Sequence, residues 1–373
     1  MVNTKRTICW VTPDEFVDCD KNPEILSEIL KKYIIHWIVI FPADGARFKE
    51  SDFKEFDGLS GLSIEFLYAK YRARDPRMLL FFEKLYRSIR KSKGDLVYFN
   101  YVPSNPFILL MYWRLNKRNT IFAAHDGSVK PSFKFPVISA AVFQLAFSTI
   151  RYVNMFSKSQ AKLFNKSFPK VKQFLIPLAL KDFGKSDNKK RTDCVSFFFF
   201  GSIHYGKNVG LLIDAACSLY EDGIRGFKVS INGVCNDWDL YQQKIKYPDL
   251  FELNIRMVEN AEIPDLFEQN HYMVFPYKEM SQSGALKVAF NYNVPVIVSN
   301  LQGFMDEVKE GVCGYIFDSQ NIGSLKEKLL FCIKTHNETY EPLVKNMKNY
   351  INEVYSTSSI SKKYLEMFDS IAD

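Results

Sequence analysis

Apolar residues along the chain alternate between short continuous runs and longer segments with helical spacing. The first half contains the strand-like runs "RTICWVT", "IIHWIVIF", "LSIEFLYA", "DLVYFNYV" and "TIFAAHD". Between them lie the helix-like segments "PEILSEILKKY" and "MLLFFEKLYRSIRKS". A second series begins at "CVSFFFFG", includes the expected strand "NIRMVE", and ends with the expected helix "IGSLKEKLLFCI". This alternation predicts two doubly wound α/β units, each with a mostly parallel sheet and helices on both faces.

The boundaries between these series predict the domains. A length of 373 residues exceeds one ordinary domain. We expect a first Rossmann-like domain over residues 1–180, a polar linker over 181–193 and a second Rossmann-like domain over 194–338. The tail, residues 339–373, has helical spacing broken at "STSS" and predicts terminal helices able to return to the first domain.

The longest apolar run is "FPVISAAVFQLAFSTI", residues 135–150. Three polar residues interrupt it, and it is shorter than the ~20 residues that a membrane span needs. We interpret it as a buried helix. The N-terminus resembles no signal peptide, and seven cysteines without a CxxC spacing suit free thiols in a reducing compartment. We therefore expect a cytoplasmic protein.

Composition is that of a soluble globular protein, with 47% hydrophobic and 24% charged residues. Charge is unevenly distributed. Residues 1–180 hold 28 Lys and Arg against 16 Asp and Glu, a balance of +12, and residues 181–373 hold 21 against 26, a balance of −5. The two balances sum to the net charge of +7. The first half should therefore meet something anionic.

Two loops of the second series carry candidate chemistry. In "FFFFGSIHYGKN", an apolar strand ends at Gly201, and His204 and Lys207 precede a helix. In "FPYKEMSQSGALKVAFNY", a strand leads into a helix whose first turn reads Ser281, Gln282, Ser283 and Gly284. Helix N-termini beyond parallel strands bind phosphate groups, and small residues let them approach the backbone. A plain turn and an ordinary serine N-cap are the alternative interpretations.

These two stretches, with "NVPVIVSNLQGFMDEVKEGVCGYIFD", resemble the donor-binding half of GT-B glycosyltransferases, and more narrowly of glycosyltransferase family 4. The resemblance covers about residues 194–318. It implies a GT-B fold, two Rossmann-like domains facing a cleft, with a nucleotide sugar as donor and no metal or other cofactor.

The resemblance also implies roles for single residues. Lys207 and His204 would neutralise the diphosphate, the amides of Ser283 and Gly284 would receive it, and Glu279 would reach the donor sugar. In the first half, "FAAHDG" is similar to a strand end that carries a histidine facing that sugar, which makes His125 the candidate. The candidate catalytic residues are thus His125, Lys207 and Glu279, and the candidate diphosphate-binding residues are Gly201, His204, Lys207, Ser281, Gln282, Ser283 and Gly284.

Two positions depart from the family pattern. The arginine that is frequent near the phosphate is His204 here, and a histidine is only partly charged near neutral pH. The second carboxylate of an E-x7-E pattern is also absent. Counting eight residues from Glu279 gives Lys287, and counting back from Pro295 gives Val288. The identity of the nucleotide therefore does not follow from the resemblance.

Two further patterns have alternatives. The triplets "DCD" at 18–20 and "DWD" at 237–239 could bind a metal in a GT-A enzyme, but Asp-x-Asp is common by chance.

Residues 70–93 hold nine Lys and Arg against two acids, interleaved with apolar residues. That segment suits an anionic membrane or a lipid-diphosphate acceptor, through Arg72, Arg74, Arg77, Arg87 and Arg90. A helix with a solvated charged face and a buried apolar stripe is an alternative of equal weight. The segment contains no recognised motif for binding nucleic acid.

We expect a glycosyltransferase that moves a sugar from a nucleotide sugar to a glycan or lipid-linked acceptor. Retention of configuration, a role in surface polysaccharide biosynthesis and peripheral contact with the inner membrane face are the finer expectations. A catalytically silent GT-B protein that binds a nucleotide, a glycan or a partner is the main alternative, and a sugar-nucleotide epimerase is the second. Neither the donor, the acceptor, the linkage nor the oligomeric state follows from the sequence.

Overall fold

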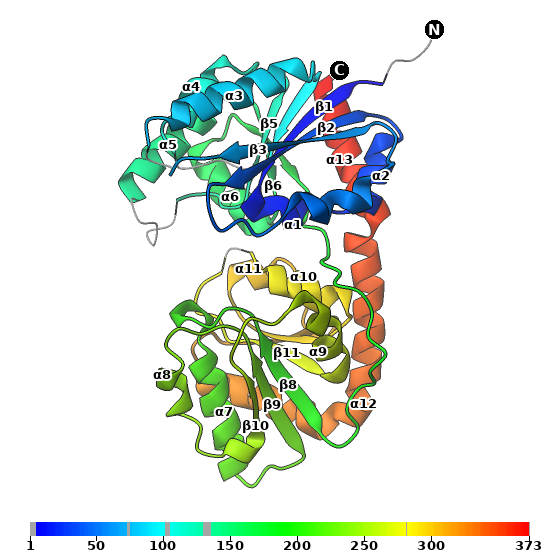
Figure 1. Cartoon of the computed structure of the whole chain (residues 1–373). Coiled ribbons are helices and arrows are strands. Elements are labelled where there is room, and N and C mark those ends of the chain that lie inside the picture. The colour runs from blue at the N-terminus through cyan, green and yellow to red at the C-terminus, as the bar shows by residue number, and fades with distance from the viewer. Residues whose placement is uncertain (1–4, 73–74, 101–104, 130–135, 281, 373) are drawn as a thin grey trace. The chain divides into compact units, whose positions relative to one another are not determined.

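The computed structural model of the chain describes residues 5–72, 75–100, 105–129, 136–280 and 282–372. The chain divides into two compact units. The first unit contains residues 1–179 and 355–373, and the second contains residues 180–354. Each unit has its own parallel sheet (Figure 1).

The sheet of the first unit has seven parallel strands among the described residues, in the order β3-β2-β1-β4-β5-β6-β7. In the central strand, Ile8 and Trp10 pack into one core cluster and Cys9 and Val11 into another. Both faces of the strand are therefore buried, as in parallel sheets covered on both sides. The strands are β1 (Thr7–Pro13), β2 (Ile34–Pro42), β3 (Leu62–Ala69), β4 (Leu96–Phe99), β5 (Thr120–Ala124), β6 (Tyr152–Met155) and β7 (Lys172–Leu175).

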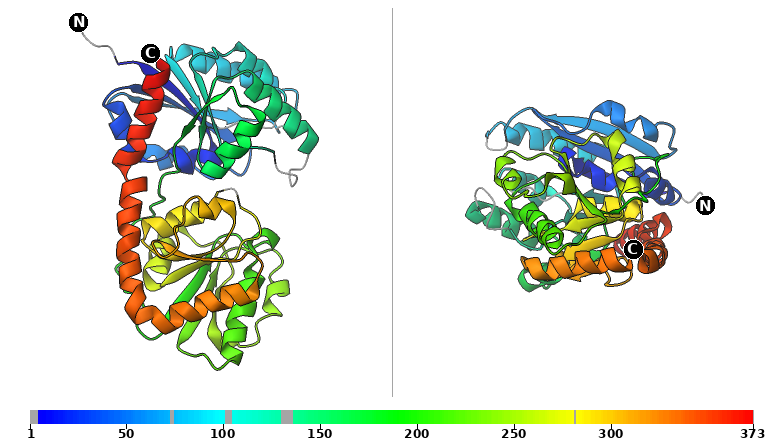
Figure 2. Two further views of the ribbon diagram at one scale, coloured as in Figure 1. Left: turned by 180° about the vertical axis from the view of Figure 1, so that it is seen from behind. Right: turned by 90° about the horizontal axis from the view of Figure 1, so that it is seen from below.

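Helices cover the two faces of this sheet (Figures 1 and 2). One core cluster lies under α3 (Met78–Lys91), α4 (Ile108–Arg114), α5 (Pro136–Ser148) and α6 (Lys158–Ser167). The other lies under α2 (Pro23–Leu30), the 3-10 helix η2 (Glu50–Phe56) and α13 (Thr357–Ala372). The short elements η1 (Asp14–Phe16) and α1 (Val17–Asp20) follow β1.

The second unit has six parallel strands in the described residues, in the order β10-β9-β8-β11-β12-β13. Phe197, Phe198 and Phe199 of β8 are all buried, so this central strand is also covered on both faces. The strands are β8 (Val195–Phe200), β9 (Phe227–Asn232), β10 (Phe251–Asn254), β11 (Tyr272–Phe275), β12 (Val296–Ser299) and β13 (Gly314–Phe317). The helices are η3 (Tyr205–Lys207), α7 (Val209–Glu221), α8 (Asp239–Gln242), η4 (Pro248–Leu250), η5 (Asn260–Glu262), α9 (Ile263–Gln269), α10 (Gly284–Asn291), α11 (Gln302–Met305) and α12 (Ile322–Tyr355).

The C-terminal tail forms one long helix and one shorter helix. Position 339, the predicted start of the terminal helices, lies inside α12. The helical conformation is interrupted at Ser356, within the "STSS" stretch. Helix α13 belongs to the first unit and packs on α2. Tyr33 donates a hydrogen bond of 2.6 Å to Asp369, and Lys32 forms an ion pair with the same carboxylate. These contacts hold the C-terminal residues on the first unit.

Five of the elements differ from the sequence predictions. The segment interpreted as a buried helix is the helix α5, but one of its faces is exposed. The strand expected at "NIRMVE" is β10, which ends at Asn254, where that stretch begins. The elements β6, α6 and β7 were not predicted, since four-residue strands with polar positions give little periodicity.

Candidate active site

In both sheets the strand order reverses beside the first strand of the unit. Ligands of open parallel sheets bind beyond the carboxyl ends of the strands at such a switch point. In the second unit the neighbours there are β8 and β11, paired at Tyr272 with Phe197 and at Met273 with Phe198. The two loops singled out in the sequence leave these two strands. The topology therefore brings them to one edge.

Three contacts join the two loops. The backbone N–H of Lys278 donates a hydrogen bond of 2.9 Å to the carbonyl of Gly206. The Lys207 ammonium lies 3.6 Å from the ring centre of Tyr277, and the Lys278 ammonium lies 3.7 Å from that of Tyr205. Each loop thus places one lysine ammonium over an aromatic ring of the other loop. Such cation–π contacts stabilise the charged form of both lysines.

Tyr277 extends the connection to helix α10. Its side chain is buried, and burial raises the pKa of its hydroxyl while a hydrogen bond with Ser283 opposes that rise. Ser283 is the N-cap of α10, and its hydroxyl accepts a hydrogen bond of 3.3 Å from the N–H of Leu286. The Lys207 ammonium, the Tyr277 ring and the first turn of α10 therefore adjoin one another. A cation beside free helical N–H groups suits a bound anion.

Lys181 adds a cation that the sequence analysis assigned to the linker. A Cβ atom built on Gly284 would lie 3.3 Å from the Lys181 ammonium nitrogen, so this group lies beside the first residue of α10. A positive charge near a helix N-terminus is unfavourable by itself, because the helix dipole is positive there. An anion bound at the same place would offset both charges. Lysine in a linker gives no periodic signal, which is why it was missed.

His204 and Glu279 lie against the turn at Gly206. A Cβ on Gly206 would lie 3.1 Å from Glu279 Oε1 and 3.2 Å from the His204 ring, so only glycine fits between them without a shift. His204 Nδ1 accepts a hydrogen bond of 3.2 Å from the N–H of Gly206. Burial first, and Lys207 second, lower the pKa of His204, against the attraction of Glu279. The ring is therefore neutral near pH 7 and offers one N–H rather than a full charge.

Gly201 shapes the exit from β8. Its φ is 132°, and a Cβ on the neighbouring Gly233 would lie 1.9 Å from the Gly201 carbonyl oxygen. The ends of β8 and β9 therefore approach so closely that a side chain at Gly233 has no room. Of the other predicted diphosphate-binding residues, Gln282 precedes the N-cap of α10, and Ser281 lies outside the described residues. The predicted roles of all these residues stay predictions.

Lys287, one of the two positions at which the E-x7-E pattern would have its second carboxylate, takes part in an internal ion pair. Lys287 lies in α10 with its side chain buried, and its ammonium contacts the carboxylate of Glu307. Burial lowers the pKa of Lys287. Lys287 is thus part of the core that supports α10.

In the first unit, His125 follows β5. Its ring lies between Phe16, at a ring-centre distance of 4.2 Å, and Phe156, at 4.5 Å. His125 Nε2 and Asn100 Oδ1 are 3.2 Å apart, so the nitrogen donates and the amide oxygen accepts. The stacking and the hydrogen bond fix the plane of the imidazole. Its predicted role towards a donor sugar stays a prediction.

Asn100 connects His125 to the buried carboxylate of Asp20. Trp10 Nε1 donates to Asp20 Oδ2 at 2.9 Å, and Thr12 Oγ1 donates to the same oxygen at 2.5 Å. Burial raises the pKa of Asp20 to about 6, while the side chains of Thr12, Asn100 and Trp10 lower it. The Asn100 contact is a loose one, since neither Asp20 Oδ1 nor Asn100 Nδ2 has a hydrogen bond of good geometry among the described residues.

The two Asp-x-Asp triplets have other neighbours. Asp18 pairs with Arg47 at 2.9 Å, whereas Asp20 is inside the core, and Asp239 begins α8. The described part of the chain holds no group of three or more side chains arranged to bind a metal.

The predicted basic residues lie on and before α3. Arg77 pairs with Asp75 at 2.6 Å and lies over the ring of Tyr71, and Arg87 pairs with Glu83 at 3.1 Å. Arg72 and Arg90 are exposed, and Arg74 lies outside the described residues.

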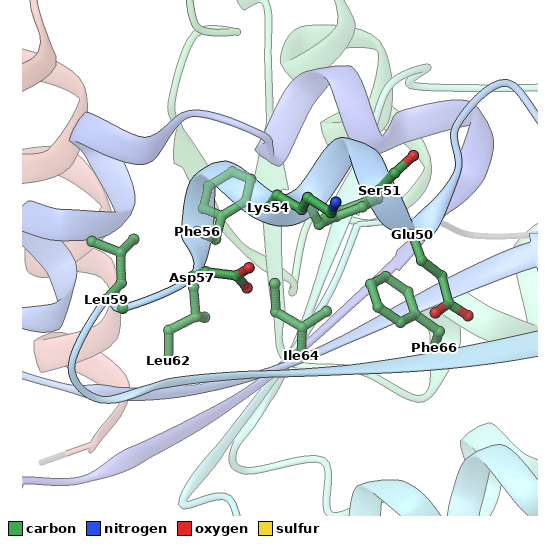
Figure 3. Close-up of a pocket in the computed structure, with 11 residues that line it drawn as sticks. Glu50, Ser51, Lys54, Phe56, Asp57, Leu59, Leu62, Ile64 and Phe66 are labelled. Atoms are coloured by element: carbon green, nitrogen blue, oxygen red, sulfur yellow. The ribbon is translucent and has the colours of Figure 1, made fainter.

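A pocket of about 520 Å³ opens between η2 and β3 (Figure 3). Leu62, Ile64 and Phe66 of β3 form its apolar floor, and Glu50 and Asp57 lie at its rim. It lies along the first part of β3 rather than at the carboxyl end, and it contains none of the predicted site residues.

Known proteins show the same fold. Residues 181–351 match the family model described as Glycosyl transferases group 1, and no curated protein matches the chain. The structure of HepE of Anabaena in complex with UDP and glucose aligns with a TM-score of 0.73 at 14% identity, over 98% of this chain and 100% of that one. A glycosyltransferase of Rickettsia africae aligns with a TM-score of 0.75 at 14% identity, over 99% of both chains.

A third similar structure is the lipopolysaccharide outer core galactosyltransferase WaaB, with a TM-score of 0.67 at 12% identity over 98% of this chain and 99% of that one. At these identities the likeness concerns the fold. Together the comparisons confirm the predicted fold class and the predicted family resemblance. The chain has the GT-B fold, and its residues 181–351 match the model of the family of glycosyl transferases group 1.

Proposed function

We propose that the protein is a glycosyltransferase whose second unit binds the diphosphate of a nucleotide sugar. The observation that carries this proposal is the convergence of Lys207 with the first turn of α10 around the buried ring of Tyr277. Lys207 would supply charge, and the amides of Ser283 and Gly284 would supply hydrogen bonds. Glu279 lies beside Gly206 at the same turn, where it would reach the hydroxyls of the donor sugar.

The proposed chemistry depends on the leaving group. When the bond between sugar and diphosphate breaks, negative charge builds up on the phosphate oxygens. A fixed ammonium group and a helix N-terminus stabilise that charge without reorganisation. The departing diphosphate would take the proton of the acceptor hydroxyl, with retention of configuration and without a metal. His125, held by Asn100, is the candidate to contact the sugar from the first unit.

Proteins of the same fold support the finer parts of the proposal by analogy. HepE binds UDP and glucose, and WaaB is a lipopolysaccharide galactosyltransferase. We accordingly propose a glycan or lipid-linked acceptor, a role in surface polysaccharide biosynthesis and membership of glycosyltransferase family 4.

The test is donor turnover by the full chain. Incubation with UDP-, GDP-, ADP- and TDP-sugars should release one nucleoside diphosphate, measured together with the sugar product by mass spectrometry. In Lys207→Ala the rate should fall by about 10²–10³-fold, as when one preorganised donor is removed. Lys345→Ala, which removes an exposed lysine of α12, is the matched control and should turn over as the wild type does.

The two alternatives give different results in the same assay. A silent binding protein would bind a nucleotide and release nothing, and the missing second carboxylate at Lys287 motivates that alternative. An epimerase would return an isomeric sugar nucleotide instead of a free nucleoside diphosphate. Equal turnover by wild type and Lys207→Ala would contradict the proposed site.

A further inference from the structure

Helix α5 exposes a face without charged residues. Val137, Ile138, Ala141 and Leu145 lie on it, spaced so that they form one stripe, while Val142, Ala146 and Phe147 on the other side enter the core. The whole helix contains no acidic or basic residue. A helix on a water-exposed surface ordinarily has charged residues on its outer face. The outer face of α5 therefore suits an apolar environment better than water.

The neighbouring helices continue this exposed apolar surface. Helix α4 contacts both α3 and α5, and all three bury their inner faces in the same core cluster (Figure 1). We define the α3–α5 surface by the exposed side chains Leu80 (68%), Leu110 (51%), Trp113 (50%), Val137 (81%), Ile138 (54%) and Leu145 (45%). Six large apolar side chains on three adjoining helices exceed the scattered ones that a surface ordinarily shows.

Cations accompany the apolar residues. Lys84, Arg87 and Arg90 are exposed on α3, and Arg114, Lys117 and Arg118 are exposed on and after α4. Glu83 is the one acidic residue of α3, and it is neutralised by ion pairs with Arg87 and Arg114. The hydrogen bonds of these arginines lower the pKa of Glu83, so it stays charged and paired. The α3–α5 surface is therefore positive overall as well as apolar.

We propose that the α3–α5 surface docks on an anionic lipid bilayer, with α5 and Trp113 entering the interface and the basic residues facing the headgroups. Helices that lie on membranes combine an apolar face with Lys and Arg, and tryptophan favours the interface. Among the described residues no helix is long and apolar enough to cross a bilayer. The proposal does not rest on the donor chemistry of the second unit.

Charge argues against the same surface pairing with a second copy. A two-fold dimer would place identical patches face to face, so the basic residues of α3 would repel one another. An anionic bilayer offers the complementary charge and an apolar phase at once. The wild type should therefore be monomeric at concentrations at which it binds vesicles.

Vesicle binding of the full chain tests the proposal. We expect it to sediment with vesicles of equal parts phosphatidylglycerol and phosphatidylcholine, to bind phosphatidylcholine alone far more weakly, and to dissociate as salt is added. Val137→Asp/Leu145→Asp should weaken binding at least about 20-fold, because it charges the inserted face. Lys84→Gln/Arg90→Gln should weaken it about 25-fold, from about fivefold per cation. Leu240→Asp charges an exposed apolar residue of the second unit and should change nothing.

Fluorescence supplies a test with the unaltered protein. Trp10 and Trp37 are buried, Trp238 of the second unit is partly buried and lies away from the α3–α5 surface in the sequence, and half of Trp113 is exposed. Brominated lipids should quench part of the emission of the wild type, and Trp113→Phe should lose that part. The proposal is overturned if the wild type binds no anionic vesicles at low salt, or if Val137→Asp/Leu145→Asp binds as tightly as the wild type. It is equally overturned if quenching persists in Trp113→Phe, or if the wild type is a dimer that only the α5 variant dissociates.

Discussion

Asp20 in the first unit and Glu307 in the second are both buried carboxylates, but their partners differ. Asp20 is surrounded by the neutral donors Trp10 and Thr12 and by Asn100, and burial raises its pKa to about 6. Glu307 faces the ammonium of Lys287. The second unit thus pairs its buried charge internally, whereas the first unit holds a carboxylate whose ionisation depends on pH.

The side chains at the two switch points also differ in charge. In the second unit, Lys207 and Lys278 lie in the loops that follow β8 and β11, and Lys181 lies beside α10. In the first unit, the hydrogen-bonded side chains of Asn100 and His125 follow β4 and β5. One strand order therefore carries a group of lysines in one unit and a hydrogen-bonded histidine in the other. The difference lies in the loops, as expected for function carried by sites on a common fold.

The largest expected effect comes from breaking the buried ion pair between Lys287 and Glu307. Lys287→Met leaves Glu307 charged and buried without a partner, which should lower the free energy of unfolding by about 3–5 kcal/mol. Chemical denaturation measures it. In Lys287→Met/Glu307→Leu most of this loss should be restored, because no charge remains buried. If the double variant were as unstable as the single one, the pair would not be the cause. Lys345→Met serves as the exposed control.

The second effect is the pH dependence of stability that arises from the buried carboxylate of Asp20. The folded state binds the proton of Asp20 more tightly than the unfolded chain does, since its pKa is about 6 against 3.8. Its contribution to stability is therefore greatest below pH 3.8 and is lost as pH rises to about 6, by roughly 3 kcal/mol. Denaturation at several pH values should show this slope in the wild type and in the control Asp44→Asn. A slope that persists in Asp20→Asn would contradict the assignment.

A smaller effect is expected from Lys181, which the sequence did not single out as a binding residue. Lys181→Ala should weaken the binding of a nucleoside diphosphate about fivefold, the order expected for one charge near a helix N-terminus. Titration calorimetry measures the affinity. Unchanged binding would show that Lys181 does not face the ligand. Lys345→Ala again provides the matched lysine.

The smallest expected effect concerns His204. Because burial and Lys207 lower its pKa, its ring is neutral, and His204→Gln keeps a neutral hydrogen-bonding group. The affinity for a nucleoside diphosphate should change by less than about threefold, and it should vary little between about pH 6.5 and 8. A large loss confined to higher pH would mean that the histidine binds as a cation.

The sequence predicted those parts of the fold that repeat strongly. Buried strands such as β1 and β8 are almost wholly apolar, and the loops after β8 and β11 have glycine and serine where a phosphate would approach. The sequence also singled out Lys207 and Ser283, which the structure brings together through Tyr277. Their separation of 76 positions gives no local signal for Tyr277, because a buried tyrosine after a strand looks like any core residue.

Other features depend on tertiary contacts that no local pattern encodes. The sequence of α5 has no charged residue on any side, so it could not distinguish a helix inside the core from one that exposes a face. Asn100 and Asp20 are separated from His125 by 25 and 105 positions, and only the sheet brings them near each other. Likewise, Lys287 is one of two positions at which the family pattern would have a carboxylate, and its partner Glu307 lies in the turn after α11.

The central claim is that the loops after β8 and β11 form a diphosphate site. Calorimetric titration of the full chain with UDP, GDP, ADP and TDP tests it most directly. We predict that at least one of them binds and that Lys207→Ala weakens this binding at least about tenfold, the order of one charge-assisted hydrogen bond, while Lys345→Ala does not. Absence of binding by all four, or equal binding by wild type and Lys207→Ala, would contradict the claim.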